Sequence, residues 1–222
     1  MNQQAYGTKL TNKSILVLGG GGHASDVVSV IESLGLDERF TILVADDSPS
    51  KDRFANRPTV AVSPIREQLQ PDHHYVLGVG YPNSKKALVA LADDAGLKPV
   101  EGLVHPSAIT ASGVFLGAGT VVGAFAYLSA LSVTGNHVYL GYGTKVGHDT
   151  IVGERTSLMP GAFVAGDATV GAGVLIGANA TILQGLTVGD DATVGAGSVV
   201  TKNVPAGSTV VGVPARIVSE NA

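Results

Sequence analysis

His148 and Asp149 have the clearest capacity for acid–base chemistry in this sequence of 222 residues. A carboxylate beside a histidine can hold the imidazole in one tautomer and keep it basic near neutral pH, which suits a general base. The same two residues could instead form a solvated turn, and on their own they favour neither reading. His137 lies eleven residues earlier, also after a Gly-containing segment, and could line the same surface, although this spacing does not place it on the equivalent face of a neighbouring coil.

A catalytic metal is not expected. A catalytic site needs three convergent ligands, and no third histidine follows His137 and His148. The sequence contains no cysteine, which excludes a thiolate nucleophile and a thiolate zinc site. Covalent catalysis through a cysteine thiolate is therefore not expected.

A glycine-rich segment suggests a second kind of chemistry, the binding of a diphosphate. Gly19-Gly20-Gly21-Gly22-His23-Ala24 follows an apolar run at residues 14–18 and precedes apolar residues at helical spacing. The glycines of such a turn let the backbone approach phosphates, and the helix N-terminus offers free N–H groups. Tight packing of the turn is the alternative explanation for the glycines.

Two further apolar runs extend this pattern. Residues 41–45 are followed by Asp46 and Asp47, at the place where an acidic side chain would meet a ribose or a base. Residues 75–79 precede Asn83, and a helix is expected from there to about Ala95. The alternation predicts a small parallel α/β domain over residues 14–104. It is too short for a full six-stranded dinucleotide fold, so half of that fold, binding a nucleotide or nucleotide sugar, is the better interpretation.

A six-residue period governs the part of the chain that must position His148 and Asp149. From Leu116 to Val200 every sixth residue is Leu, Ile or Val except Thr134, and Gly follows at ten of the fifteen steps. This period predicts a hexapeptide-repeat β-helix whose inward aliphatic residues fill its axis. Three hexads in each coil would give five coils, roughly 24 Å tall at about 4.8 Å per coil. Chemistry is then confined to outward corners such as His148-Asp149.

Composition narrows the partners and the setting. Hydrophobic residues make up 45% of the chain and charged residues 14%, and the net charge of −4 argues against nucleic acid as a partner. The polar N-terminus lacks a signal-peptide core, and no stretch approaches the roughly 20 apolar residues of a membrane span. We expect a cytoplasmic protein with four parts: a polar segment (1–13), the α/β domain (14–104), the β-helix (105–205) and a C-terminal tail (206–222). His105, before a proline at the junction, is expected to be structural.

The chain resembles the sugar O/N-acetyltransferases of the hexapeptide-repeat class, close to bacterial enzymes acting on nucleotide-linked 4-amino sugars. The resemblance covers residues 14–216 and rests on the six-residue period together with several segments. These are the Gly19–His23 turn, Asp46-Asp47, Gly78-Val79-Gly80 with Asn83, Val104–Ala108, Gly147-His148-Asp149 and Val211–Ala215.

The resemblance implies a left-handed β-helix and a homotrimer with active sites between subunits. Acetyl-CoA would lie between adjacent prisms, and the N-terminal domain would hold a nucleotide-linked amino sugar. The implied activity is acetyl transfer to the amino group of that sugar, in bacterial surface-glycan biosynthesis. Three alternatives remain: O-acetylation of a sugar hydroxyl of the sialic acid type, a non-catalytic trimeric scaffold, and a nicotinamide oxidoreductase. The last would leave the β-helix without a role.

The resemblance also assigns roles to residues. His148 would be the general base, Asp149 the acidic residue that polarises it, and the Gly166 N–H the donor to the thioester carbonyl. The implied acetyl-CoA residues are Gly166, Ala178, Ala196, Lys202 and Arg216. The implied nucleotide-sugar residues are Gly20, Gly22, His23, Asp46, Asp47 and Asn83, none of which distinguishes uracil, guanine or thymine.

Two positions depart from the pattern of the resembling enzymes. Where this chain has Gly141 they often have Asn, and where it has Ser157 they often have a second His. Both positions would lie near the acceptor. Acetyl transfer is therefore better defined by the sequence than the identity of the sugar or of its acetylated group.

Overall fold

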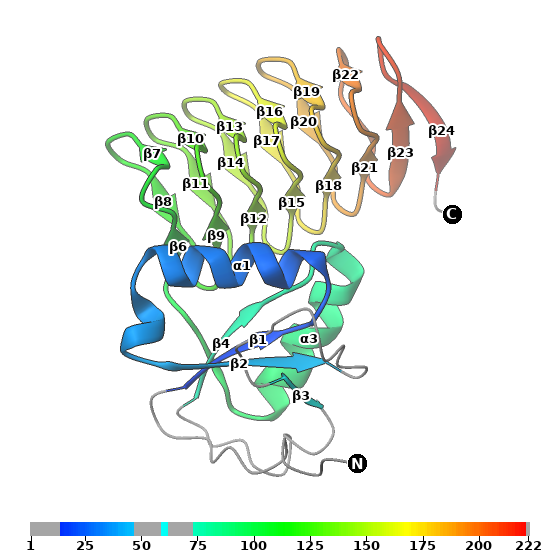
Figure 1. Ribbon diagram of the computed structural model, residues 1–222. Helices are drawn as coiled ribbons and strands as arrows, with labels where there is room; N and C mark the ends of the chain where they lie inside the picture. The colour runs from blue at the N-terminus through cyan, green and yellow to red at the C-terminus, as the bar shows by residue number, and fades with distance from the viewer. Residues whose placement is uncertain (1–13, 47–58, 62–72, 221–222) are drawn as a thin grey trace. The chain divides into compact units, whose positions relative to one another are not determined.

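The computed structural model describes residues 14–46, 59–61 and 73–220. Two compact units emerge from its contacts: Met1–Val79 with Ser84–Val100, and Gly80–Asn83 with Glu101–Ala222. The first unit holds the α/β elements and the second the β-helix (Figure 1). No helix among the described residues has the length and apolar character to cross a membrane.

A five-stranded parallel sheet forms the centre of the first unit, in the order β3-β2-β1-β4-β5. Its strands are β1 (Ser14–Leu18), β2 (Thr41–Asp46), β3 (Thr59–Ala61), β4 (His74–Leu77) and β5 (Lys98–Pro99). The helical elements are α1 (Gly22–Ser33), the 3₁₀ helix η1 (Leu36–Glu38) and α3 (Pro82–Asp94), which begins in the second unit. Every residue of β1 is buried, as expected for a central parallel strand. The predicted small parallel sheet is confirmed.

Three sheets of two-residue strands form the β-helix. The β13 sheet contains β7 (Ile109–Thr110), β10 (Tyr127–Leu128), β13 (Lys145–Val146), β16 (Phe163–Val164), β19 (Thr181–Ile182) and β22 (Val199–Val200). The β14 sheet contains β8 (Phe115–Leu116), β11 (Val133–Thr134), β14 (Ile151–Val152), β17 (Thr169–Val170) and β20 (Thr187–Val188). The β15 sheet contains β6 (Leu103–Val104), β9 (Val121–Val122), β12 (Tyr139–Leu140), β15 (Ser157–Leu158), β18 (Leu175–Ile176), β21 (Thr193–Val194), β23 (Ser208–Val211) and β24 (Arg216–Glu220).

The coils repeat every 18 residues, as three hexads per coil predict. Lys145 of β13 pairs in parallel with Tyr127 in the preceding coil and with Phe163 in the next. The second residue of most strands points into the axis, where Leu128, Val146 and Val164 are fully buried. Thr134, the one exception to the aliphatic rule, is also buried, and its hydroxyl oxygen lies 3.4 Å from the N–H of Gly117 as an acceptor. The β-helix is confirmed and is consistent with a left-handed coil.

The prism is about one coil longer than expected. The β13 sheet has six strands because it begins with β7, and β6 likewise precedes Leu116 in the β15 sheet. At the other end, β23 pairs in parallel with β21, and β24 turns back antiparallel to β23. Corner residues three positions after an inward aliphatic adopt positive φ; they include Asp149 (55°) and Asp167 (56°). Aspartate is among the non-glycine residues that tolerate this conformation best.

Candidate functional site

His148 and Asp149 form the corner that follows β13. One coil later the same corner is formed by Gly166 and Asp167, and a further coil later by Gln184 and Gly185. Backbone hydrogen bonds fix this stacking: Asp167 N–H donates to the His148 carbonyl at 2.9 Å, and Gly185 N–H donates to the Gly166 carbonyl at 3.0 Å. We call His148, Gly166, Gln184 and Lys202, spaced by 18 residues, the His148 column.

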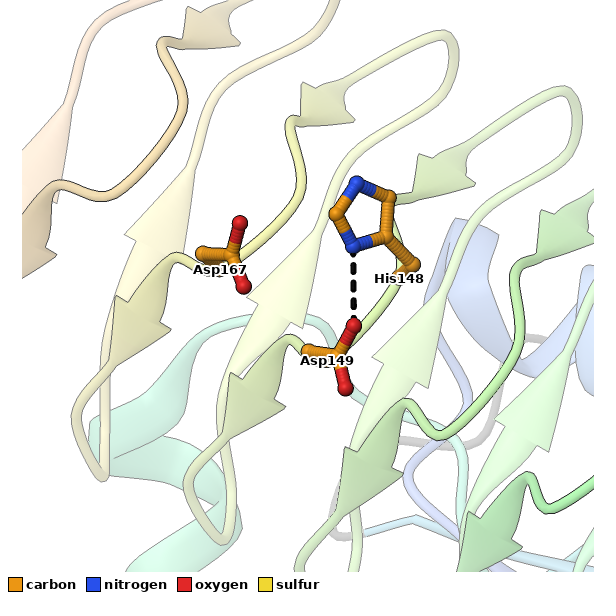
Figure 2. Close-up of side chains that lie close together, drawn as sticks. All are labelled: His148, Asp149 and Asp167. Carbon is orange, nitrogen blue, oxygen red and sulfur yellow. Dashed lines mark hydrogen bonds and ion pairs between the residues drawn. The ribbon is translucent and has the colours of Figure 1, made fainter.

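The imidazole and carboxylate of this corner are directly paired. His148 Nδ1 lies 2.9 Å from Asp149 Oδ2, and the two side chains are 52% and 48% exposed (Figure 2). A carboxylate accepts hydrogen bonds and does not donate them, so this contact places the imidazole proton on Nδ1. Nε2 is then left as an acceptor on an exposed ring. This is the tautomer that a general base requires.

Gly166 lies directly beneath that acceptor. A Cβ added at Gly166 would come within 2.5 Å of His148 Nε2, so any larger residue would displace the ring. A Cβ at Gly147 would in turn meet the Gly166 nitrogen at 2.3 Å. The Gly166 N–H makes no hydrogen bond with any residue that the structure describes, whereas its carbonyl is used. A base and an N–H donor without a hydrogen bond are thus brought to one corner by adjacent coils.

Asp167 is a third polar residue of this site, and the sequence reasoning missed it. Ligand-type atoms of His148, Asp149 and Asp167 all lie within 4.8 Å of one another, and Figure 2 shows them gathered at one corner. Gln184 Nε2 donates to Asp167 Oδ2 at 2.9 Å. Exposed carboxylates commonly gather in this way without a cation, so the cluster does not by itself identify a metal site. Adding one 18-residue coil to Asp149 would have found Asp167.

Other histidines of the β-helix lie away from this corner. His137 forms the corner after β11, is only 7% exposed and has its ring against Gly119. His137 therefore does not line the same surface as His148 within one chain, in keeping with a spacing of eleven residues that does not match the 18-residue coil. His105 accepts hydrogen bonds at Nδ1 from the Ser107 N–H (3.1 Å), with the Ser107 hydroxyl at 2.8 Å, in keeping with a structural role.

The predicted acetyl-CoA residues fall on two different corners. Lys202 continues the His148 column and lines a cavity of about 340 Å³ together with Arg216 and the aliphatic side chains of Val200, Val204 and Ile217. Ala178 and Ala196 follow β18 and β21 of the β15 sheet, at another corner of the prism. One chain therefore brings together the two predicted cations, but not the two alanines with His148.

Both departures from the expected pattern have structural correlates. A Cβ at Gly141 would lie 2.8 Å from the backbone nitrogen of Pro160, so an asparagine would not fit there without a shift of the next coil. Ser157 is fully buried on β15, and its hydroxyl has no hydrogen-bond partner within the described part of the chain.

In the first unit, part of the predicted nucleotide-sugar site is assembled. The Gly19–Gly22 turn joins β1 to α1, and a Cβ at Gly20 would lie 2.3 Å from Asp46 Oδ2, so this carboxylate packs against the turn. Gly22 and His23 begin α1. Asp47 lies outside the described residues. Asn83 is the second residue of α3 and belongs to the second unit.

Two charged groups modify the surroundings of His23. Partial burial lowers the pKa of His23 from its ordinary value; the Asp26 carboxylate opposes this shift and Lys85 adds to it. Lys85, on the first turn of α3, is 1% exposed, and burial lowers its pKa well below the ordinary value. Lys85 is not among the site residues predicted from the sequence, since a lysine at a helix start is usually solvated.

Comparisons with known proteins agree with the fold. A family model described as the hexapeptide repeat of succinyl-transferase matches residues 167–202. None of the curated proteins compared matches the chain. Among solved structures, a mutant of perosamine N-acetyltransferase from Caulobacter crescentus, in complex with CoA and GDP-perosamine, is 28% identical. The match covers 95% of this chain and 99% of that one, with a TM-score of 0.84.

Two further structures are similar over nearly their whole length. The acetyltransferase domain of PglB from Neisseria gonorrhoeae, in complex with acetyl coenzyme A, is 29% identical, with coverage of 94% and 100% and a TM-score of 0.84. WeeI from Acinetobacter baumannii is 26% identical, with coverage of 92% and 99% and a TM-score of 0.84. The expected resemblance to sugar acetyltransferases and the expected enzyme class, an acyltransferase, are confirmed.

Proposed function

We propose that this acyltransferase moves the acetyl group of acetyl-CoA directly to the amino group of a nucleotide-linked 4-amino sugar. The observation that carries the proposal is the His148–Asp149 pair seated over Gly166, which joins a base of defined tautomer to a free N–H donor. The co-substrate is supported by the similar proteins solved with CoA or acetyl-CoA. We place the reaction in the bacterial cytoplasm, in surface-glycan biosynthesis, the setting that the resemblance implies.

The reaction follows from these two groups. The neutral sugar amine attacks the thioester carbonyl while His148 Nε2 takes a proton from the nitrogen, a step typically worth about 10²–10⁴-fold. The Gly166 N–H donates to the oxygen on which negative charge develops. Collapse of the tetrahedral intermediate breaks the C–S bond, and the CoA thiolate leaves and receives the proton. The products are the acetamido sugar and CoA.

The His148 column indicates the direction in which acetyl-CoA would lie along the prism. Lys202 lies three coils beyond His148, roughly 14 Å away at about 4.8 Å per coil. An extended pantetheine arm starting at Gly166 would pass Gln184 and bring the CoA phosphates towards Lys202 and Arg216. The cavity that these two cations share supports this direction.

Removing these cations tests that direction. We expect Lys202→Ala and Arg216→Ala each to raise the KM for acetyl-CoA about threefold to tenfold with little change in kcat, since both charges are partly solvent-screened. Steady-state kinetics with acetyl-CoA and with its analogue lacking the 3′-phosphate measure the effect. The variants should discriminate less between the two donors than the unmodified enzyme does. Lys98→Ala, an exposed lysine on β5, is the matched control. An unchanged KM in the double variant Lys202→Ala/Arg216→Ala contradicts the assignment.

The proposed assembly is a homotrimer with sites between subunits. Ala178 and Ala196 lie at a different corner from His148, so a site using all of these residues needs a second chain. The β14 sheet also exposes a ladder of apolar side chains, Phe115, Val133 and Ile151, of the kind that oligomers cover. Sedimentation velocity should give the mass of three chains. A catalytically active monomer would overturn this part of the proposal.

The acceptor is tested by product analysis. A thermal-shift screen of nucleotide sugars, with and without CoA, selects the ligand, and mass spectrometry of products from matched amine and hydroxyl acceptors identifies the acetylated group. N-acetylation supports the proposal. Transfer to the hydroxyl acceptor alone would identify a sugar O-acetyltransferase, and absence of any acetyl-CoA binding would identify a scaffold.

A further inference from the structure

Polar side chains at one corner of the prism cap backbone N–H groups of the preceding coil. The Asn136 side-chain oxygen accepts from the Ala118 N–H at 3.0 Å, and Asp190 accepts from the Ala172 N–H at 2.8 Å. In both pairs the residues are 18 apart and occupy the second position after the inward residue of a strand. A polar side chain at this position can therefore satisfy the N–H directly below it.

Gly166 and Gln184 are the equivalent pair in the His148 column, and there the cap is missing. Gln184 carries the same amide group as Asn136 with one more methylene. Its Nε2 instead donates sideways to Asp167 Oδ2 at 2.9 Å. Because a carboxylate only accepts hydrogen bonds, Asp167 fixes which way the Gln184 amide is turned. The Gly166 N–H stays without a hydrogen bond among the described residues.

We propose that Asp167 is a positioning residue that restrains Gln184 and thereby keeps the Gly166 N–H open for the acyl oxygen. The inference rests on the proposed function of this corner. A buried N–H without a partner is costly, and Gly166 is buried. Released from Asp167, Gln184 would turn its side-chain oxygen to the Gly166 N–H, as Asn136 does to Ala118. The cap would compete with the substrate for the same donor.

Four variants isolate this effect. Asp167→Ala should lower kcat about threefold to tenfold, the range expected for one competing hydrogen bond, with a smaller change in the KM for acetyl-CoA. Asp167→Asn should keep most of the activity, because the asparagine oxygen still accepts from Gln184. Gln184→Ala is the reference for the double variant: adding Asp167→Ala to it should lower kcat little further, so that Asp167→Ala/Gln184→Ala recovers most of the loss caused by Asp167→Ala.

The alternative role for Asp167 is a direct electrostatic effect on His148, and the same series separates the two. Under that alternative, Asp167→Asn would lose as much as Asp167→Ala, and the double variant would keep the full loss. Either of these results, or an Asp167→Ala variant as active as the unmodified enzyme, overturns the inference. Each leaves the proposed function intact, whereas an unmodified enzyme that transfers no acetyl group refutes the proposed function.

A crystal structure of the Asp167→Ala variant supplies a readout that does not depend on activity. Gln184 should be found with its side-chain oxygen within hydrogen-bonding distance of the Gly166 nitrogen. In the Asp167→Asn variant Gln184 should remain turned towards residue 167. A Gln184 side chain that stays away from Gly166 in the alanine variant contradicts the inference.

Discussion

Replacing His148 by alanine is expected to lower kcat by about 10²–10⁴-fold while the KM for acetyl-CoA changes little. Among the described residues, His148 is the one imidazole at this corner. Its tautomer is fixed by the 2.9 Å contact between Nδ1 and Asp149 Oδ2. Its ring is exposed at the outer corner, away from the axial core. Steady-state kinetics and acetyl-CoA titration of the His148→Ala variant measure the two parameters separately.

His137→Ala is the matched control for that experiment. His137 is also a corner histidine of the β-helix, but it lies after β11 and is nearly buried. Its replacement should affect thermal stability and leave the kcat of the folded enzyme near its original value. Asp149→Asn should fall between the two, because an amide can still contact Nδ1 but no longer requires the proton to lie there. Near-unchanged turnover in His148→Ala would sink the assignment of the base.

Gly166→Ala is expected to cost about 10²-fold in kcat, the loss that a misplacement of roughly 1 Å can cause. The new methyl group would lie 2.5 Å from His148 Nε2, so the ring must move. Coil geometry itself tolerates alanine here, since Ala130 occupies the equivalent corner position two coils earlier. The expected loss is therefore functional, and thermal denaturation should show little change.

A double-mutant cycle ties the Gly166 effect to His148. In a His148→Ala background the clash is gone, so Gly166→Ala should add little further loss, far short of the sum of the two single effects. Fully additive losses would show that the methyl group acts elsewhere, for example by blocking the Gly166 N–H. An active Gly166→Ala single variant would show that the ring can move without consequence for the reaction.

The six-residue period was sufficient to predict the β-helix, its 18-residue coil and the outward position of His148 and Asp149. It did not reveal the additional coil before Leu116, although the β-helix was expected from residue 105. The inward position before Leu116 is Thr110, which is exposed at the end of the stack and needs no aliphatic side chain. The regular period in the sequence therefore begins at Leu116, whereas the coils of the structure already begin at β6 (Leu103–Val104).

Contacts between coils were the part that the sequence reasoning missed. Asp167 lies 18 residues from Asp149, and Gln184 lies 17 residues from Asp167. Patterns among neighbouring residues therefore predict neither the approach of Asp167 to Asp149 nor its hydrogen bond with Gln184. His137 was misplaced for the same reason. Ala178 and Ala196 were assigned by resemblance, and in a single chain they lie at a different corner from the base, after β18 and β21.

The 18-residue coil fixes the distances between residues of one column to multiples of the coil spacing. The distance between His148 and Lys202 can change only by whole coils, in steps of about 4.8 Å. An insertion that is not a multiple of six would turn Val164 or Ile182 out of the axis, where both are now fully buried, and one of six or twelve residues would move Lys202 to another corner of the prism. The distance between the base and the cation can therefore differ between related chains only in steps of one coil. A donor molecule whose reactive and anionic ends are separated by an intermediate distance would match neither of two successive spacings between the base and the cation.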